Sequence, residues 1–302
     1  MASEQFGKGK VIQMDREYGS QSMVTRLRKV LVKRPDEGFA VEDYVKWHYT
    51  DRPDLLEAQR EHDAFTEILR KDGIEVFYHD EPQPSRADSI FTYDPAIVTD
   101  QGAIILNMGK PLRRGEEPPM RRRLQELGIP ILYTIKEDAR VEGGDLLWID
   151  HDTLAVGQGF RTNRQGLLQI REAVEPLDVE VLPVELPYFL GPEACLHLMS
   201  LISLVDHDLA VCYLLLMPVP FWKCLKERGF DLIEVSEEEF NAMGINVLAL
   251  SPKRCLMLDT APITKQMLEE AGCQVLIYNG VEISLKTEGG PTCLTRPILR
   301  DI

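Results

Sequence analysis

A repeating pattern of two strands, a helix and a further strand is the feature that most constrains how this chain can fold. Short apolar runs predict strands at residues 30–33, 75–78, 96–99, 103–106, 129–133, 146–149, 153–156, 180–183, 209–212, 231–234, 247–250, 255–258 and 274–277. Helical periodicity predicts helices at 55–71, 119–127, 166–174, 221–228, 236–243 and 264–271. The unit recurs about five times at intervals of roughly 50 to 60 residues, the length scale of repeat architectures.

The copies share this pattern but not their sequences. Tight polar turns within each unit predict hairpins covered by a helix on one side, with the opposite strand ends converging on a centre. An ordinary mixed α/β domain without a repeat would fit the same runs. No Ser/Gly/Pro-rich linker or block of charge interrupts the chain, so we expect one domain over residues 1–302.

Composition narrows the possible partners. The chain carries 49 acidic and 34 basic residues, a net charge of -15, which argues against a nucleic-acid or anionic-membrane partner and is compatible with a cationic small molecule. No apolar run is long enough for a membrane span and the N-terminus lacks a signal-peptide pattern, which predicts a cytoplasmic protein. Six cysteines without a CxxC pair and six scattered histidines predict neither a disulfide framework nor a metal site, and most of the thiols are expected to be buried.

Two acidic segments stand out from core and surface. In Asp88-Ser-Ile-Phe-Thr-Tyr-Asp94-Pro, two acids flank aromatic residues before an apolar strand, although an acid before proline is commonly only a turn residue. In Glu142-Gly-Gly-Asp145, paired glycines would allow a sharp turn that presents carboxylates beside a buried strand. Such a carboxylate could bind a guanidinium through two hydrogen bonds, whereas the alternative is a bulge with solvated acids.

Two further segments offer a nucleophile and a base. His197 lies between apolar residues in Cys-Leu-His-Leu-Met, where a histidine is more often part of the core than catalytic. Cys293 follows Gly-Gly-Pro-Thr, a rigid turn that could expose its sulfur. A thiolate becomes a strong nucleophile when a cation or a nearby histidine lowers its pKa. Gly157-Gln-Gly-Phe-Arg161 lacks the third glycine of a dinucleotide-binding fingerprint.

Together these segments resemble a known family. FTYDP, EGGD, RTN, LHL and GGPTCLTRP occur in the order found in the dimethylarginine dimethylaminohydrolases and, more distantly, in the arginine deiminases and amidinotransferases. The similarity runs from the strand at Lys29 to Cys293 and implies an α/β fold, a five-bladed α/β propeller of ββαβ modules called the pentein fold. It also places a substrate-covering loop near residues 15–22.

The resemblance implies a role for each site residue. Cys293 would attack the guanidinium carbon, His197 would protonate the leaving amine and then activate water, and Glu142 would orient His197 and help to hold the substrate cation. Asp94 would bind the guanidinium nitrogens. Arg113 and Arg161 would bind the substrate carboxylate and Asp88 the amino-acid end. No cofactor is implied, and a homodimer is expected only because dimers are common.

The sequence leaves the substrate open. Met199 stands where arginine deiminases carry a second aspartate, which favours methylated arginine over arginine, and Tyr93 stands where nearer relatives have an acid. Hydrolysis to citrulline and an amine is the leading interpretation. The alternatives are an arginine deiminase, an amidinotransferase that passes the amidino group to an amine, and a binding module that has lost activity.

Overall fold

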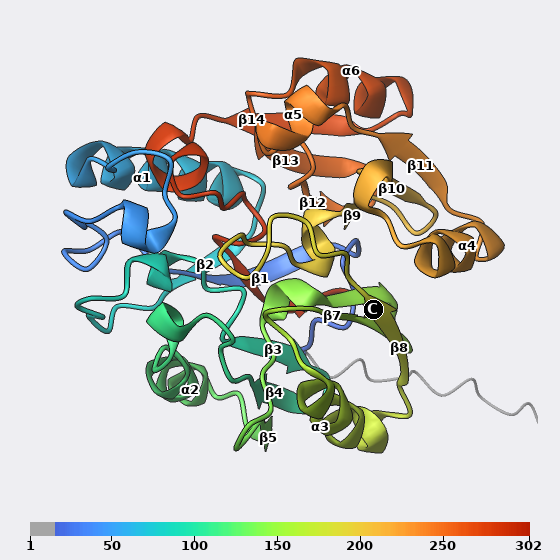
Figure 1. Cartoon of the computed structure of the whole chain (residues 1–302), viewed down its shortest axis with the longest axis horizontal. Coiled ribbons are helices and arrows are strands. Elements are labelled where there is room, and N and C mark those ends of the chain that lie inside the picture. Colours follow the sequence, from blue (N-terminus) through green and yellow to red (C-terminus); the bar gives the residue numbers. More distant parts are fainter. Residues whose placement is uncertain (1–15) are drawn as a thin grey trace, which may run out of the picture.

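Five three-stranded sheets build the protein, and the computed structural model describes them over residues 16–302 (Figure 1). In every sheet the first strand is antiparallel to the second, and the second is parallel to the third. The sheets, first strand first, are β15 (Arg296–Arg300), β1 (Leu27–Val32) and β2 (Glu75–Tyr78); β3 (Ala96–Thr99), β4 (Gly102–Ile105) and β5 (Ile131–Thr134); β6 (Leu146–Asp150), β7 (Thr153–Gln158) and β8 (Glu180–Glu185); β9 (Ile202–Leu204), β10 (Leu209–Cys212) and β11 (Asp231–Glu234); and β12 (Leu248–Ser251), β13 (Arg254–Leu258) and β14 (Gln274–Tyr278).

A helix joins the second and third strands of each sheet, and these helices lie around the outside of the ring (Figure 1). They are α1 (Leu55–Lys71), α2 (Glu117–Glu126), α3 (Arg164–Val174), α4 (Val219–Glu227) and α6 (Pro262–Glu270), and a short α5 (Glu237–Asn241) follows β11. Short turns of 3-10 helix are η1 (Val45–Trp47), η2 (Ala87–Ile90), η3 (Pro111–Arg113), η4 (Gly143–Asp145), η5 (Glu175–Leu177), η6 (Leu198–Ser200) and η7 (Leu214–Leu216), and η8 (Val281–Leu285) is a π-helical turn.

The helices follow from ordinary amphipathic patterning and capping. Asp54 accepts hydrogen bonds from the backbone N–H groups of Leu56 and Glu57 and so caps the start of α1. Residues Ala58, Phe65 and Leu69 of α1 are buried at helical spacing, which fixes the face that packs inward.

The predicted repeat is confirmed, and the five-bladed α/β propeller is the observed fold. Two strands were not predicted. β9 has only three residues and follows η6 directly, so it is too short to give an alternating pattern. β15 reads Arg-Pro-Ile-Leu-Arg, in which proline and two charged residues argue against a strand.

β15 is an edge strand that returns the C-terminal end of the chain to the first sheet, where Pro297 pairs with Val30. Its two arginines are buried and bind backbone carbonyls of neighbouring sheets. Arg296 donates to the carbonyls of Tyr93 and Ala96, and Arg300 donates to that of Ala249 at 2.8 Å. Buried cations with carbonyl partners therefore connect β15 to β3 and β12 and close the ring.

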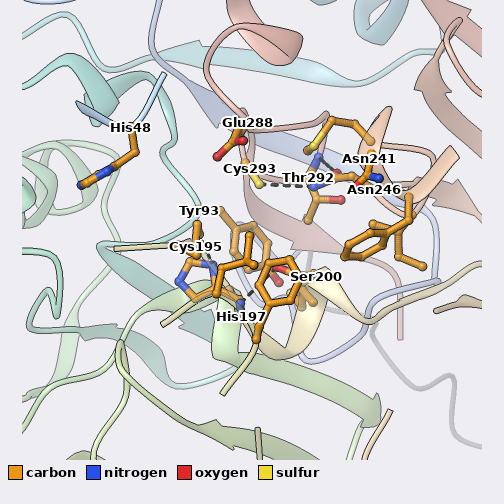
Figure 2. Close-up of a pocket in the computed structure, with 18 of the residues that line it drawn as sticks. His48, Tyr93, Cys195, His197, Ser200, Asn241, Asn246, Glu288, Thr292 and Cys293 are labelled. Atoms are coloured by element: carbon orange, nitrogen blue, oxygen red, sulfur yellow. Dashed lines mark hydrogen bonds between the residues drawn. The ribbon is translucent and has the colours of Figure 1, made fainter. Parts of the chain in front are cut away.

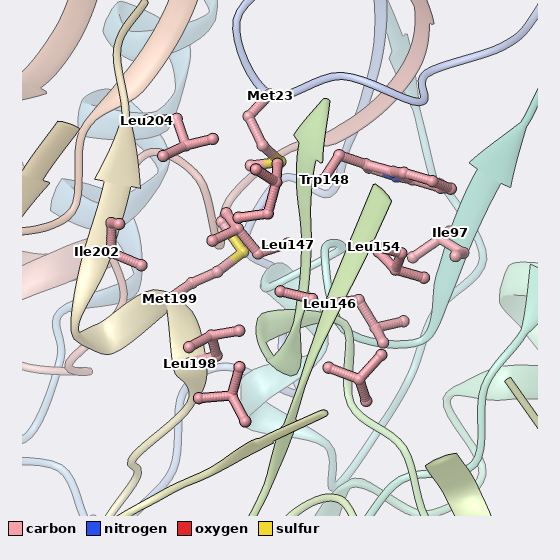
Figure 3. Close-up of a cluster of buried hydrophobic side chains, with 14 of the residues drawn as sticks. Met23, Ile97, Leu146, Leu147, Trp148, Leu154, Leu198, Met199, Ile202 and Leu204 are labelled. Atoms are coloured by element: carbon pink, nitrogen blue, oxygen red, sulfur yellow. The ribbon is translucent and has the colours of Figure 1, made fainter. Parts of the chain in front are cut away.

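The largest buried apolar cluster lies among β6, β7 and β9, beside the turn that carries His197 (Figure 3). It includes Leu147, Trp148, Met199 and Ile202. This core anchors the backbone that presents the histidine.

The loop expected near residues 15–22 does not cover a cavity at the site. Asp15 lies outside the described residues. Gly19 exchanges backbone hydrogen bonds with β15, donating to Ile298 and accepting from Arg300 at 2.8 and 2.9 Å. Residues 16–22 are thus held along the last strand, and this expectation was wrong for the part of the segment that the structure describes.

Candidate active site

The polar residues of the site occupy equivalent places in the five modules. Asp94 precedes β3, Glu142 precedes β6, His197 precedes β9, Asn246 precedes β12 and Cys293 precedes β15. Each lies just before the first strand of a sheet. Five distant segments therefore contribute one side chain each to the same region of the ring.

Glu142 and His197 form the most tightly held pair. Nε2 of His197 lies 2.7 Å from Oε2 of Glu142, and Glu142 is fully buried. The other carboxylate oxygen, Oε1, accepts the backbone N–H of Lys110 at 2.7 Å. Burial opposes the charged carboxylate, but the hydrogen bond and charge of His197, with the cation of Arg161, outweigh it and lower the pKa of Glu142.

The imidazole of His197 is stabilised in its charged form. Burial acts to lower its pKa, but the neighbouring Cys195 sulfur and the Glu142 carboxylate outweigh burial and raise the pKa of His197 well above its ordinary value. Gly144 packs against the ring so closely that a Cβ there would collide with Nδ1. The glycine of the EGGD segment is therefore needed where the imidazole lies.

Cys293 is half-buried and receives one side-chain hydrogen bond, from Nδ2 of Asn246 to Sγ at 3.3 Å. Burial, followed by the nearby Asp94 carboxylate, raises the pKa of the Cys293 thiol to about 11. Asn246 also accepts the backbone N–H of Thr292 through Oδ1 at 3.1 Å, so its amide holds the turn before the cysteine. Asn246 was not predicted from the sequence, although its place before β12, equivalent to that of Asp94 before β3, could have indicated it.

Cys195 is a second thiol at the site. Its Sγ lies 3.6 Å from Nδ1 of His197, and the residue is exposed. Burial of the sulfur atom opposes ionisation, but the charges of His197 and Arg161 outweigh this and lower the pKa of Cys195. The expectation that most of the six cysteines are buried is not met, because only Cys212, Cys255 and Cys273 are buried, whereas Cys224 and Cys293 are half-buried and Cys195 is exposed.

Asp94 is held by a buried ionic network. One of its oxygens accepts the backbone N–H of Gly144 at 2.8 Å, and the other pairs with Arg113. Arg113 is only 3% exposed and also binds Glu116 at 2.7 Å and the carbonyl of Phe91 at 2.9 Å. Its donors are thus directed at protein groups, and the geometry fits a residue that positions Asp94 better than one that binds a substrate carboxylate.

Lys110, which was not predicted from the sequence, pairs with Asp88. Lys110 Nζ lies 2.6 Å from one carboxylate oxygen of Asp88, and the hydroxyl of Tyr49 donates to the other at 2.8 Å. A lone lysine in a turn gives no signal in the sequence.

Arg161 is buried at 6% exposure, and its guanidinium makes one ionic contact with a described residue, at 3.4 Å to Glu142.

Two adjoining cavities meet at these residues. The wide chamber has a volume of about 410 Å³, and the charged chamber, lined by Asp88, Lys110, Arg113 and Arg161, about 50 Å³. Both are bordered by the same set of residues: His48, Asp94, Glu193, Cys195, His197, Glu288 and Cys293. Figure 2 shows Cys293 and Asn246 on one side of the wide chamber and Cys195 and His197 on the other.

The structure thus brings Cys293, His197, Asp94, Asp88, Arg113 and Arg161 to the walls of these cavities. Glu142 lines neither cavity and reaches the site through His197.

Over residues 16–302, no group of three or more His, Cys, Asp or Glu side chains is arranged to hold a metal ion, and no helix is long and apolar enough to cross a membrane.

A ring of five ββαβ modules with a cysteine, a histidine and carboxylates before its first strands defines the class of guanidino-group-modifying enzymes with the pentein fold. The family model described as N,N-dimethylarginine dimethylhydrolase, eukaryotic, matches residues 48–300. The chain belongs to the dimethylarginine dimethylaminohydrolase family, and it is an amidine hydrolase.

Individual relatives agree with this assignment. The N(G),N(G)-dimethylarginine dimethylaminohydrolase of Streptomyces coelicolor is 31% identical over 268 residues, which cover 89% of this chain and 96% of the relative. The structure of the Pseudomonas aeruginosa enzyme, a cysteine-to-serine mutant complexed with citrulline, has a TM-score of 0.76 at 21% identity and covers 91% of this chain and 100% of that one. SxtG, an amidinotransferase from Microseira wollei, has a TM-score of 0.76 at 18% identity, covering 94% and 97%, and so shares the fold.

Proposed function

We propose that this chain hydrolyses a methylated arginine to citrulline and an amine, with Cys293 as the nucleophile. One observation carries this proposal: a thiol, an imidazole and a carboxylate, from Cys293, His197 and Asp94, border the same junction between two cavities. A guanidinium is a planar cation with a weakly electrophilic carbon. It needs a carboxylate to bind it, a nucleophile to attack it and an acid to protonate the departing nitrogen.

Cys293 ionises in the presence of substrate. Its pKa is raised to about 11 by burial and by Asp94, so the free protein holds it mainly as a thiol at neutral pH. A guanidinium bound between Asp94 and Cys293 would offset the carboxylate charge and stabilise the thiolate. Asn246 supports the same charge by donating to Sγ at 3.3 Å.

His197 then serves as acid and as base. The thiolate forms a C–S bond with the guanidinium carbon, and the substituted nitrogen leaves as an amine after taking a proton from the imidazolium. The neutral imidazole next accepts a proton from a water molecule, and the oxygen of that water attacks the thiouronium carbon. The C–S bond breaks, the ureido product leaves and the thiolate is restored. Because the pKa of His197 is raised, the imidazole begins the reaction in the protonated form that the first step needs.

The charged chamber suits the amino-acid end of the substrate. Arg161 borders it with one contact at 3.4 Å among the described residues, so this guanidinium has donors left for a carboxylate. Asp88 and Lys110 form an ion pair on the same wall and supply charges of both signs for an α-amino acid. Arg113 acts through Asp94, because its own donors are directed at Asp94, Glu116 and Phe91.

The test is direct turnover. Purified protein would be incubated with asymmetric dimethylarginine, monomethylarginine and arginine, and both the ureido product and the released amine would be measured. Citrulline from the methylated substrates that is lost in Cys293→Ser and kept in Cys195→Ser would support the proposal. Citrulline from arginine alone would assign a deiminase despite Met199. Transfer to an added amine in preference to water would assign an amidinotransferase.

Cytoplasmic location and a homodimer stay predictions that belong to this proposal. Six free cysteines fit a reducing compartment. Cell fractionation and light scattering would test the two predictions separately.

A further inference from the structure

We propose that the wide chamber receives an apolar N-substituent of the guanidine that is larger than methyl. This inference rests on the proposed function and specifies its substrate class. The preferred substrate would be an arginine that carries one alkyl or aryl group of several carbons on its terminal nitrogen.

Charge sets the orientation of the substrate in the two chambers. None of the described residues that line the wide chamber is a lysine or an arginine, whereas Lys110, Arg113 and Arg161 line the charged chamber. Among the described residues, a substrate carboxylate therefore finds lysine and arginine partners only in the charged chamber, while the imidazolium of His197 lies at the junction. With the guanidinium at the junction, its terminal nitrogen points into the wide chamber.

The wide chamber has an apolar far wall. Phe189 and Phe240 lie edge to face, with ring centroids 6.3 Å apart, and Phe240 stacks on Tyr213 at 4.0 Å. Met199, Met243 and Ile245 line the same cavity. A wall built from aromatic rings and methionine favours an apolar group of some size, because such side chains offer large contact surfaces.

The volume of this chamber exceeds what a methyl group needs. A methyl group is about as large as a water molecule, whose share of the liquid is about 30 Å³. The wide chamber measures about 410 Å³, within the range of sites that hold whole small molecules. The charged chamber, at about 50 Å³, admits only a compact group. One or two methyl groups would leave most of the wide chamber to water.

An alkyl series measures this preference without a change in chemistry. Nω-methyl-, Nω-propyl- and Nω-pentyl-arginine release primary alkylamines of similar basicity, so differences in kcat/KM report mainly on burial of the chain. Each added methylene should raise kcat/KM by about four-fold until the chamber is filled, so propyl, with two more methylenes, should exceed methyl by roughly 16-fold. Mass spectrometry of citrulline and the alkylamine identifies the bond that is cleaved.

A matched pair of variants locates the substituent. Phe189 is a half-buried loop residue on the chamber wall, so Phe189→Ala should lower the propyl-to-methyl ratio by several-fold. Phe160 is an exposed loop phenylalanine that packs on Tyr188 at 5.8 Å and lines neither chamber, so Phe160→Ala should keep the wild-type ratio. Circular dichroism would show that both variants are folded.

The outcomes separate this inference from the proposed function. Turnover of the methyl substrate with slower turnover of propyl and pentyl would overturn the inference and leave the function standing. A propyl preference that survives in Phe189→Ala would also overturn it, because the substituent would then lie elsewhere. No turnover of any member, including dimethylarginine and arginine, would overturn both.

Discussion

The two thiols of the site should separate chemical reactivity from catalysis. Cys293 has its pKa raised from an ordinary 9.0 to about 11, whereas the charges of His197 and Arg161 lower the pKa of Cys195. We therefore expect a neutral alkylating agent to modify Cys195 first in the free protein. Turnover should nevertheless depend on Cys293.

The magnitude follows from the pKa of Cys293. A rise of two units from 9.0 to about 11 leaves about 100-fold less thiolate at neutral pH than an ordinary cysteine has. A thiolate of higher pKa is intrinsically more nucleophilic, and a Brønsted slope of about 0.4–0.5 restores about ten-fold. Cys293 should thus react about ten-fold more slowly than an ordinary cysteine. The lowered pKa of Cys195 leaves it more thiolate than an ordinary cysteine has, so the ratio between the two alkylation rates should be at least ten-fold.

The assay is alkylation by iodoacetamide at pH 7.5 without substrate, with peptide mass spectrometry to quantify each site over time. Cys195→Ser and Cys293→Ser provide the matched controls, since each keeps one of the two sulfurs. Cys195→Ser should retain hydrolysis and Cys293→Ser should abolish it. The alkylation rate of Cys293 should rise about ten-fold per pH unit from pH 7 to 10, because its thiolate fraction does so below the pKa.

Two results would refute this reasoning. Faster alkylation of Cys293 than of Cys195 would mean that burial and Asp94 do not suppress its ionisation. Loss of hydrolysis in Cys195→Ser with activity kept in Cys293→Ser would make Cys195 the nucleophile. His197, which contacts Cys195, would then be oriented by Glu142.

Three further substitutions test the supporting contacts. Glu142→Gln should lower the pKa of His197, measured by NMR titration, and reduce kcat by about 10²- to 10⁴-fold. Folding lowers the pKa of Glu142, so its carboxylate stabilises the folded state at neutral pH. The difference in the free energy of unfolding between wild type and this variant should therefore be full above about pH 4.5 and shrink as the pH falls below it. Gly144→Ala should displace the imidazole and reduce kcat more than it reduces the melting temperature, since the added Cβ meets Nδ1 of His197. Arg113→Met should lower the free energy of unfolding by about 3–5 kcal/mol in a denaturant titration, because it leaves Asp94 and Glu116 without their buried partner, while Arg114→Met at the exposed neighbour should change it little.

The fold was predictable to the extent that each element carries its own pattern. α1 was predicted with its observed bounds, because its apolar face is long and capped by Asp54. β15 was not, because its strand pairing uses residues that ordinarily avoid strands. Arg296 and Arg300 are tolerated there only because carbonyls of other sheets receive their donors, and a single sequence does not show those partners.

The site was predictable mainly through the family resemblance. His197 and Glu142 were expected to pair, and they lie 2.7 Å apart. The predicted contact of Arg113 with a substrate carboxylate depended on the arginine being available, which the sequence could not show. Glu116, three residues later, occupies much of its donor capacity. Lys110 and Asn246 were missed because neither belongs to a motif that carries chemistry by itself.

Closure of the ring and completion of the site are one structural event. Cys293 lies in the turn that leads into β15, and its carbonyl accepts the backbone N–H of Tyr93, next to Asp94, at 3.3 Å. Arg296, at the start of β15, donates to the carbonyl of the same Tyr93 at 3.0 Å and lies 3.9 Å from the centre of its ring. The pairing of β15 with β1 thus brings the nucleophile to the carboxylate that would hold the substrate.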